Sequence, residues 1–442
     1  MLLIHVPKLT NRLGYTLNVL LKHVLRAEFG ITTDDAQFQA YEGAKLCYGP
    51  HQIADGPYIK SCNLLFETSI EEQEPRPFQR NGQWMMFPVY GHDTDLPFDP
   101  LAATFYMVSR YEEYLPHRED EHGRFASQEC LAVQSGFADE PVVDQWALML
   151  QQIIEKHYPD YTWPARHYRF VQTVDIDAAW CYLHKGIFRT MVGTLRDIFV
   201  RHDLPEVGRR IRVLLGREKD PYDTFDYILE QYKKRPGSKL IFFTLVSDYD
   251  QYDKPANHQN PHTRDLLQHL DDYASMGIHP GYDALEDPKV VDNDTRRLEN
   301  ILHRTISKSR YHFLRLQMPK SYNTLIHAGL KDDYTMGYAD ITGFRAGISS
   351  PYPFYDLERD HETELILHPF CVMDTTLQRY LKLSPEEGLE RYRTLIEKTK
   401  TVGGTFCFII HNQNLCNLYG WEGWREVYEQ MLEMAKPTEH HD

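Results

Sequence analysis

Residues 168–177, YRFVQTVDID, decide the fold of this chain. The segment is a short, largely apolar strand pattern that ends in two aspartates spaced two apart, Asp175 and Asp177. In an extended strand this spacing puts both carboxylates on one face. Two carboxylates so close repel each other unless they share a cation or a proton. Either an aspartate caps the next helix, or one binds a metal ion and the other is a general base.

Short apolar segments alternate with helical patterns beyond residue 168. We predict strands over 169–176, 239–246, 276–280, 311–316, 341–346, 364–369 and 405–411. Helical patterns occupy 223–233, 263–275, 292–306, 321–330 and 385–401. This alternation predicts an α/β fold with a parallel sheet and helices outside it. About seven units in roughly 280 residues indicate a distorted, partly irregular β/α barrel, in which chemistry occurs at the C-terminal strand ends.

The first 160 residues have a different pattern. We predict a strand over 1–6 and helices over 13–29, 98–115 and about 143–157. Residues 157–168 contain two prolines and no helical periodicity, so we place a domain boundary there. The expected organisation is a smaller α+β N-terminal domain (1–160), which folds separately and carries no catalytic residue, and the barrel (161–442). Residues 183–216 are expected to form a basic helical insertion after the first strand of the barrel.

Composition excludes some classes of protein. The chain has 442 residues and a net charge of −16, and such an acidic surface repels nucleic acid. We find no run of eighteen uncharged apolar residues, so no transmembrane segment is expected, and the first residues lack the pattern of a secretory signal. The seven cysteines are scattered without a CxxC pair, which favours reduced thiols and a cytoplasmic location.

Four further residues, on predicted strands or at their ends, suggest chemistry. His279, in GIHPGYD (277–283), is suited to bind a metal ion, although a lone histidine is more often structural. Arg310 and His312 lie two apart on one predicted strand face; they are either a carboxylate partner and a metal ligand, or an edge arginine and a half-buried histidine. His411 ends the apolar run TFCFIIHN (405–412) and is either a general acid or a strand end that reaches water.

In this order, the motifs resemble those of the polysaccharide deacetylase (NodB-homology) family. The matching segments are TVDID (173–177), GIHPGY (277–282), SRYHFLRL (309–316), GFRAG (343–347), LILHPFCVMD (365–374) and FIIHN (408–412). The resemblance covers about residues 168–415. It implies a metal-dependent hydrolase of carbon–nitrogen bonds that removes the acetyl group from an N-acetylated sugar or glycan, so that carbohydrate is the expected partner.

The resemblance also implies roles for individual residues. Asp175 would be the general base, Asp177 and His279 would bind the metal ion, and His411 would be the general acid. Arg310 or Arg345 would hold the base ionised. The ion is expected to be zinc, with cobalt, nickel or manganese as alternatives, and it would lower the pKa of a bound water molecule.

One position departs from the family pattern. The family usually has a second metal-binding histidine four residues after the first, where this chain has Asp283. Either Asp283 or His312 must complete a three-ligand site, or metal binding is weak or absent. We favour His312, because imidazole suits a divalent transition metal and neighbouring strands lie only about 4.8 Å apart. We expect Gly281 to let the loop turn Asp283 away.

Two other functions compete with deacetylation. The chain could be an inactive glycan-binding barrel that has lost one metal ligand. It could also be a glycoside hydrolase that uses Asp175 and Asp177, but two acids on one strand are poorly placed to flank a glycosidic bond at separations of about 5–9 Å. Tyr282, Trp180 and Tyr352 are candidates for stacking on sugar rings.

Overall fold

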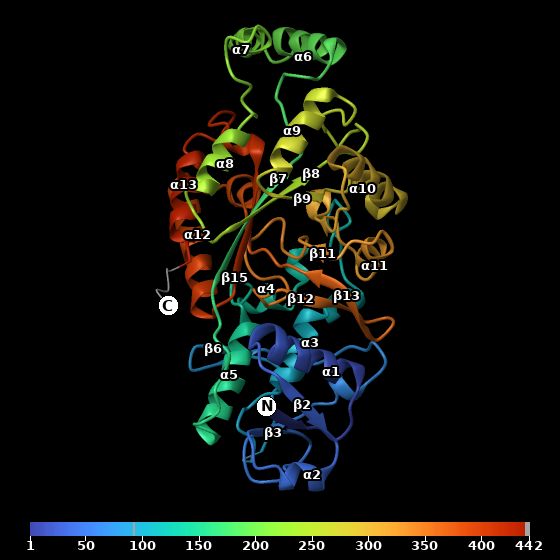
Figure 1. The fold of residues 1–442 in the computed structure, drawn as a ribbon, viewed down its shortest axis with the longest axis vertical. Coiled ribbons are helices and arrows are strands. Elements are labelled where there is room, and N and C mark those ends of the chain that lie inside the picture. Colours follow the sequence, from blue (N-terminus) through green and yellow to red (C-terminus); the bar gives the residue numbers. More distant parts are fainter. Residues whose placement is uncertain (92, 438–442) are drawn as a thin grey trace.

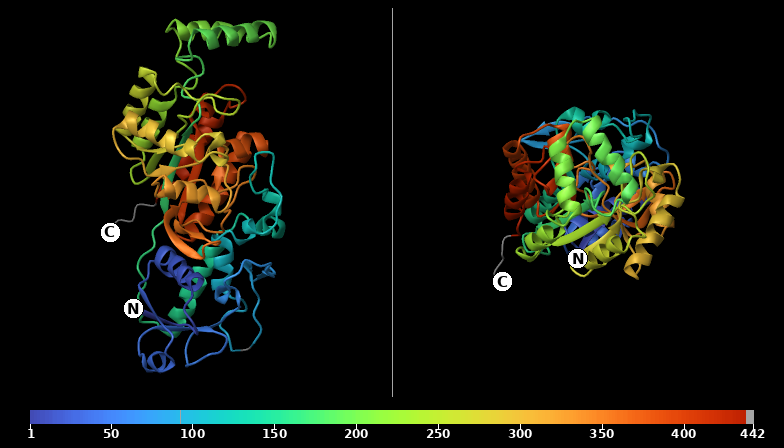
Figure 2. Two further views of the ribbon diagram at one scale, coloured as in Figure 1. Left: turned by 90° about the vertical axis from the view of Figure 1, so that its right-hand side faces the viewer. Right: turned by 90° about the horizontal axis from the view of Figure 1, so that it is seen from above.

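The computed structural model describes residues 1–91 and 93–437 of an elongated molecule (Figure 1). The N-terminal part lies at one end, a large sheet lies in the middle, and the helices α6 and α7 lie across the other end (Figures 1 and 2). None of the helices in these ranges combines the length and the apolar character that crossing a bilayer requires.

The N-terminal part is built around a parallel four-stranded sheet of order β2-β1-β3-β4. Its strands are β1 (Leu2–His5), β2 (Phe29–Thr32), β3 (Lys45–Gly49) and β4 (Tyr58–Lys60). The expected α+β arrangement is therefore wrong. Helical segments connect β1 to β2 and β2 to β3, and such crossovers make neighbouring strands parallel. Strands β2 to β4 are short and were not recognised in the sequence.

Helices and one hairpin complete the N-terminal part. The helical segments are α1 (Asn11–Leu17), η1 (Asn18–Val24), α2 (Asp35–Ala40), η2 (Leu64–Phe66), α3 (Pro100–Val108), η3 (Tyr111–Tyr114), η4 (Ser127–Glu129), α4 (Leu131–Ser135) and α5 (Val142–His157). The hairpin pairs β5 (Phe78–Arg80) with β6 (Gln83–Met85). Asp99 begins α3 by accepting hydrogen bonds from the backbone N–H groups of Leu101 and Ala102, and Pro100 occupies the first helical turn.

The second sheet has nine strands in the order β12-β13-β11-β10-β9-β8-β7-β15-β14. The strands are β7 (Arg169–Ile176), β8 (Lys239–Thr244), β9 (Ser275–Ile278), β10 (Lys308–Ser309), β11 (Asp332–Asp333), β12 (Tyr352–Asp356), β13 (His361–Leu367), β14 (Val372–Met373) and β15 (Thr405–His411). All neighbours are parallel except β12 and β13.

This sheet is open, which corrects the expectation of a barrel. Within residues 1–91 and 93–437, no strand pairing joins β12 to β14. The predicted strand 341–346 is irregular, because its backbone bonds to other parts of the chain. Gly343 N donates to Cys371 O, and Phe344 N donates to Ala138 O of the N-terminal part.

The helical segments of this part surround the second sheet, except α6 and α7, which lie across the end of the molecule (Figure 1). They are α6 (Ile187–Phe199), α7 (Leu204–Leu214), α8 (Phe225–Lys233), α9 (Pro261–Asp271), η5 (Tyr282–Leu285), α10 (Lys289–Leu302), η6 (His312–Leu314), α11 (Lys320–His327), η7 (Thr376–Tyr380), α12 (Pro385–Thr401), η8 (Asn412–Leu415) and α13 (Trp424–Met434). Ser384 and Glu387 form a capping box at the start of α12.

The two faces of the sheet bury different side chains. Phe170, Val174 and Phe408 belong to the large core shared with the helices. Val171 and Ile409 face the opposite way and join a smaller apolar cluster. Because side chains alternate along a strand, the residues that follow Val171 at even spacing, up to Asp175, point toward the smaller cluster. The same holds for His411, which follows Ile409.

The N-terminal part and the large sheet share one hydrophobic core, which extends from Leu2 to Ala435. Buried polar contacts also cross between them. Asp144 of α5 accepts hydrogen bonds from the backbone and side chain of Ser349 and from the side chain of Ser350. Glu113 pairs with Arg345. The two parts are therefore joined by a continuous and partly charged interface.

Candidate active site

The chemically active side chains gather at the C-terminal edge of the second sheet. Asp175 and Asp177 lie at the end of β7, and His279 and Arg310 directly follow β9 and β10. His411 is the last residue of β15 and is in register with Asp175 on β7. These strands are parallel, so their ends meet at one edge of the sheet, as we expected from the sequence.

Asp177, His279 and His312 form a cluster with the geometry of a metal site. Their potential ligand atoms all lie within 4.8 Å of one another. Asp177 Oδ1 is 3.4 Å from His279 Nε2 and 3.7 Å from His312 Nε2. Both Asp177 Oδ1 and His279 Nε2 are buried without a hydrogen-bond partner. Buried polar atoms rarely remain unpaired, so this arrangement fits a cation bound between them.

Each histidine of this cluster is oriented through its other ring nitrogen. His279 Nδ1 lies 2.5 Å from the carbonyl oxygen of Arg310, and His312 Nδ1 lies 2.6 Å from Asp253 Oδ1. Such contacts fix the ring and leave Nε2 for an ion, as is usual for metal-binding histidines. Asp253 was missed in the sequence, because it lies in a loop outside the matched motifs.

His312 reaches the cluster from a tight turn, not from the strand face that we expected. β10 ends at Ser309, and His312 begins the short helix η6. Phe313 and Leu314 both have positive φ, 57° and 55°, which ends the extended conformation. Arg310 and His312 therefore point to different partners, Asp175 and Asp177.

Asp283 is exposed in η5 and does not belong to the cluster. We expected the conformational freedom of Gly281 to turn Asp283 away from the cluster. This explanation is wrong, because Gly281 has an ordinary φ of −61°. A side chain at Gly281 would instead collide with Ser247 and Asp253. Asp253 also accepts a hydrogen bond from the backbone N–H of Tyr282. The close packing of Gly281 against Asp253 therefore holds this loop beside His312.

Of the two candidate arginines, only Arg310 contacts Asp175. Arg310 Nη1 donates a 2.7 Å hydrogen bond to Asp175 Oδ1, and Arg310 Nε donates to the carbonyl oxygen of Tyr334. Arg345 lies elsewhere, where its guanidinium pairs with both oxygens of Glu113 at 2.7 and 2.9 Å. The sequence did not separate the two, because both stand in similar short motifs.

His411 is held by a carboxylate whose role we missed. Its Nδ1 lies 2.8 Å from Asp374 Oδ1, and its backbone N–H donates to Asp374 Oδ2. Asn414 also donates to Asp374. The other ring nitrogen, Nε2, lies 3.7 Å from Asp177 Oδ2 and so faces the cluster. Asp374 ends the segment LILHPFCVMD, and its place directly after an apolar segment was the available signal.

The charges of the site shift the pKa values of its groups. Burial alone would raise the pKa of Asp177, but the three surrounding imidazoles outweigh burial and hold that pKa well below its usual range. Burial would lower the pKa of His411, but Asp374 and Asp177 raise it to about 10. Burial also opposes protonation of His279, yet Asp175 and Asp177 raise its pKa.

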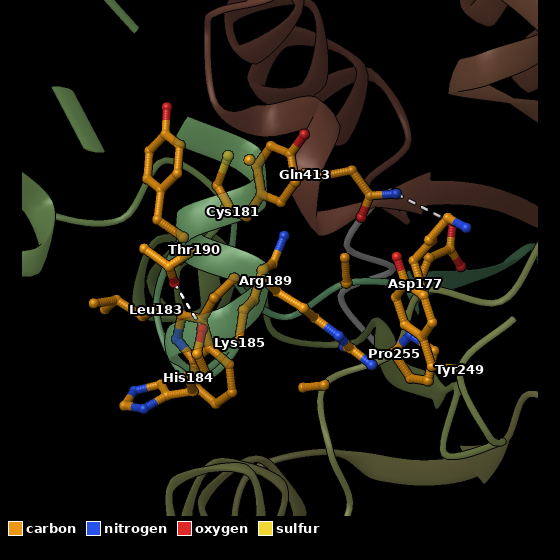
Figure 3. Close-up of a pocket in the computed structure, with 18 of the residues that line it drawn as sticks. Asp177, Cys181, Leu183, His184, Lys185, Arg189, Thr190, Tyr249, Pro255 and Gln413 are labelled. Carbon is orange, nitrogen blue, oxygen red and sulfur yellow. Dashed lines mark hydrogen bonds between the residues drawn. The ribbon is translucent and has the colours of Figure 1, made fainter. Parts of the chain in front are cut away.

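Two adjoining cavities open beside the cluster. The smaller, of about 350 Å³, is lined by Asp175, Asp177, His279, His312 and His411. The larger, of about 1230 Å³, continues from Asp177 toward α6. Figure 3 shows Gln413 donating to Asp177 in this larger cavity, with Lys185 and Arg189 across the space.

The N-terminal part contributes to the wall of the smaller cavity. Arg124 lines it and donates a hydrogen bond to the carbonyl oxygen of Phe313, in the turn that carries His312. Of the three aromatic residues expected to stack on sugars, Trp180 lines the larger cavity, whereas Tyr282 stacks on Tyr252. Tyr352 is fully buried in β12.

Comparison with known proteins gives two kinds of match. A family of unknown function (DUF7033) matches residues 2–159. No protein with a curated description matches the chain. Among solved structures, one described as a polysaccharide deacetylase from Mycobacterium smegmatis is 14% identical, with a TM-score of 0.38; the match covers 62% of this chain and 88% of that one.

Two further structures align over similar lengths. A polysaccharide deacetylase from Bacillus cereus is 10% identical, with a TM-score of 0.30, over 63% of this chain and 93% of that one. A 7,8-dihydropteroate synthase from Vibrio fischeri is 9% identical, with a TM-score of 0.29, over 63% and 94%. Matches with TM-scores and identities this low include enzymes of different kinds, so any functional conclusion must rest on the site itself.

Proposed function

We propose that this protein is a metal-dependent hydrolase that removes the acetyl group from an N-acetylated sugar or glycan. The observation that carries the proposal is the cluster of Asp177, His279 and His312, with two unpartnered buried ligand atoms, between Asp175 and His411. A metal site flanked by one carboxylate and one imidazole has the parts that amide hydrolysis requires.

Asp177, His279 and His312 would hold the ion. Three protein ligands of the O, N, N type suit zinc and leave a position open, as in catalytic sites. When bound, the ion would act as a Lewis acid that polarises the acetamide carbonyl and lowers the pKa of water. His312 would take the place of the missing second histidine, and its position in the cluster supports an active enzyme over the inactive glycan-binding alternative.

Asp175 is placed to act as the general base. Arg310 occupies its Oδ1, and its Oδ2 lies 3.8 Å from His279 Nε2. Asp175 lines the smaller cavity, where its Oδ2 would take a proton from the attacking water. Arg310 does not touch the reacting atoms in this scheme and acts by positioning Asp175.

His411 is placed to act as the general acid. Asp374 holds its Nδ1 and favours the imidazolium form, so that Nε2 carries a proton on the side of the cluster. That proton can pass to the nitrogen of the leaving amine as the amide bond breaks. The two proton-transfer groups thus stand on neighbouring strands, β7 and β15.

The test is acetate release from a panel of N-acetylated monosaccharides, oligosaccharides and polysaccharides, together with metal analysis of the purified protein. We expect activity that a chelator abolishes and that zinc, cobalt, nickel or manganese restores. Asp175→Asn should keep the metal and lose turnover. A protein that binds metal and glycan but releases no acetate would support the inactive alternative, and one that binds no metal would refute the proposal.

A further inference from the structure

Helices α6 and α7 form a hairpin that lies across the end of the molecule remote from the N-terminal part (Figures 1 and 2). The hairpin corresponds to the basic insertion expected from the sequence, and the proposed chemistry does not use it. The view from above shows the two helices side by side (Figure 2).

The outer side of the hairpin is apolar and uncovered. On α6, Ile187, Met191, Leu195 and Phe199 recur every four residues, a spacing that aligns them along one side of a helix. Ile187 is 82% exposed and Phe199 is 69% exposed. We call the following exposed residues the outer apolar stripe: Ile187, Met191, Leu195, Phe199, Leu204, Ile211, Leu214 and Leu215.

The stripe faces away from the larger cavity. None of its residues lines that cavity, whereas Arg189, Gly193 and Arg196 of α6 and Glu206 and Arg210 of α7 do. The side of the hairpin toward the cavity is mixed, since Phe188 and Val192 lie there beside the arginines, whereas the side toward solvent carries the outer apolar stripe. A monomer rarely leaves so many large apolar side chains together on its surface unless they meet another surface.

The hairpin is also strongly basic. Residues 185–217 contain eight Lys or Arg and three Asp or Glu, a net charge of +5 in a chain whose total is −16. Two of the acids are buried within the hairpin: Asp197 pairs with Arg201 and Arg210, and Glu206 pairs with Arg209. Arg196 and Arg217 have no ion-pair partner within residues 1–91 and 93–437.

We infer that the α6–α7 hairpin binds the surface of an anionic lipid bilayer. A basic amphipathic helix with an uncovered apolar side is suited to lie in the interface, with apolar side chains among the acyl chains and arginines among the anionic headgroups. The helices lie across the end of the molecule, so both can meet a flat surface together (Figure 2). An acidic protein that carries a single basic end would approach such a surface with that end first.

Co-sedimentation of the full chain with lipid vesicles tests this inference without any measurement of activity. We expect binding to vesicles of phosphatidylcholine with phosphatidylglycerol, and about ten-fold weaker binding to phosphatidylcholine alone. High salt should weaken the binding, because it screens the arginines. The double variant Leu195→Ser/Phe199→Ser should bind at least about ten-fold more weakly than the parent protein.

A matched control removes equally exposed apolar residues from the N-terminal part. Leu9 and Tyr90 are 52% and 76% exposed, so Leu9→Ser/Tyr90→Ser should leave vesicle binding unchanged. Circular dichroism should show both variants to be folded. Failure of the parent protein to bind, or equal binding by the hairpin variant, would overturn the inference. Sedimentation velocity could also overturn it. If the parent protein were a dimer that does not bind vesicles, and the hairpin variant were a monomer, the stripe would be a subunit interface.

Discussion

Arg310 donates a 2.7 Å hydrogen bond to Asp175, and both side chains are buried. The same guanidinium lies 4.5 Å from the ring centroid of Phe243 and donates to the carbonyl oxygen of Tyr334. Arg310 is thus fixed by the protein and in turn fixes one oxygen of the proposed base. The pair links the ends of β7 and β10.

Replacing Arg310 should impair turnover without removing the metal. We expect Arg310→Gln to lower kcat by about 10- to 100-fold, less than loss of the base itself, which typically costs about 10²–10⁴-fold. Arg310→Lys keeps the positive charge and should recover part of this loss. Unchanged KM and metal content would distinguish positioning of Asp175 from a general loss of structure. An Arg310→Gln variant with normal kcat would refute the role.

The identity of the third metal ligand can be tested by calorimetric zinc titration. His312→Ala should weaken zinc binding by more than about 100-fold, and Asp253→Asn, which removes the charge of the partner of His312 but keeps its size, by about 10- to 100-fold. Asp177→Ala and His279→Ala should abolish binding. Asp283→Ala is the matched control and should bind normally, because its side chain is exposed outside the cluster. The reverse pattern, with Asp283 essential and His312 dispensable, would contradict the assignment.

The roles of His411 and Asp374 can be separated from that of the metal by changing the leaving group. An amine must be protonated to leave, whereas para-nitrophenolate leaves without a proton. We therefore expect His411→Ala and Asp374→Asn to lose about 100-fold or more in amide hydrolysis and much less in hydrolysis of para-nitrophenyl acetate. Equal losses on both substrates would argue against a general acid at this position.

Glu113 should make the stability of the protein depend on pH. Burial alone would raise its pKa, but Arg345 and Arg110 outweigh burial and lower it. Because the pKa is lowered in the folded state, the ionised Glu113 contributes stability above the unfolded pKa of about 4.3. This stability is lost as the pH falls through the folded pKa.

Glu113→Gln should lower the free energy of unfolding by about 3–5 kcal/mol at pH 7, because it leaves the buried Arg345 without a counter-charge and Arg110 with Glu112 alone. Urea unfolding should show this difference shrinking at pH values below about 4.3. Glu74→Gln, which removes an exposed carboxylate paired with Arg76, is the control and should have little effect at either pH. A constant difference between Glu113→Gln and the parent protein at all pH values would contradict the ion-pair explanation.

The fragment 161–442 should not fold well alone. The sequence suggested separate folding, but the structure buries Arg345 against Glu113 and Ser349 against Asp144. Without residues 1–160, a charged group and a long apolar surface would be exposed. We expect the fragment to aggregate when expressed alone and to become soluble when residues 1–160 are expressed with it. A soluble, metal-binding fragment would show that the interface is dispensable.

Local patterns in the sequence determined several elements of the fold. Strands 169–176 and 405–411 have the predicted bounds, because each is a short segment rich in β-branched and aromatic residues that ends at charged or polar side chains. The helix over 385–401 was also predicted correctly, since its first turn carries a capping signal. The order of Asp175, Asp177, His279 and His411 along the chain placed them together, because parallel strands end at one edge of a sheet.

Only the tertiary structure decided how these elements combine. The sheet is open, and the backbone of residues 343 and 344 bonds to Cys371 and to Ala138, which lies some two hundred residues away in sequence. The choice of Arg310 over Arg345 depends on which carboxylate each meets, Asp175 or Glu113. Such contacts join side chains that are distant in sequence, and their geometry is set by packing, so no local pattern of residue types can specify them.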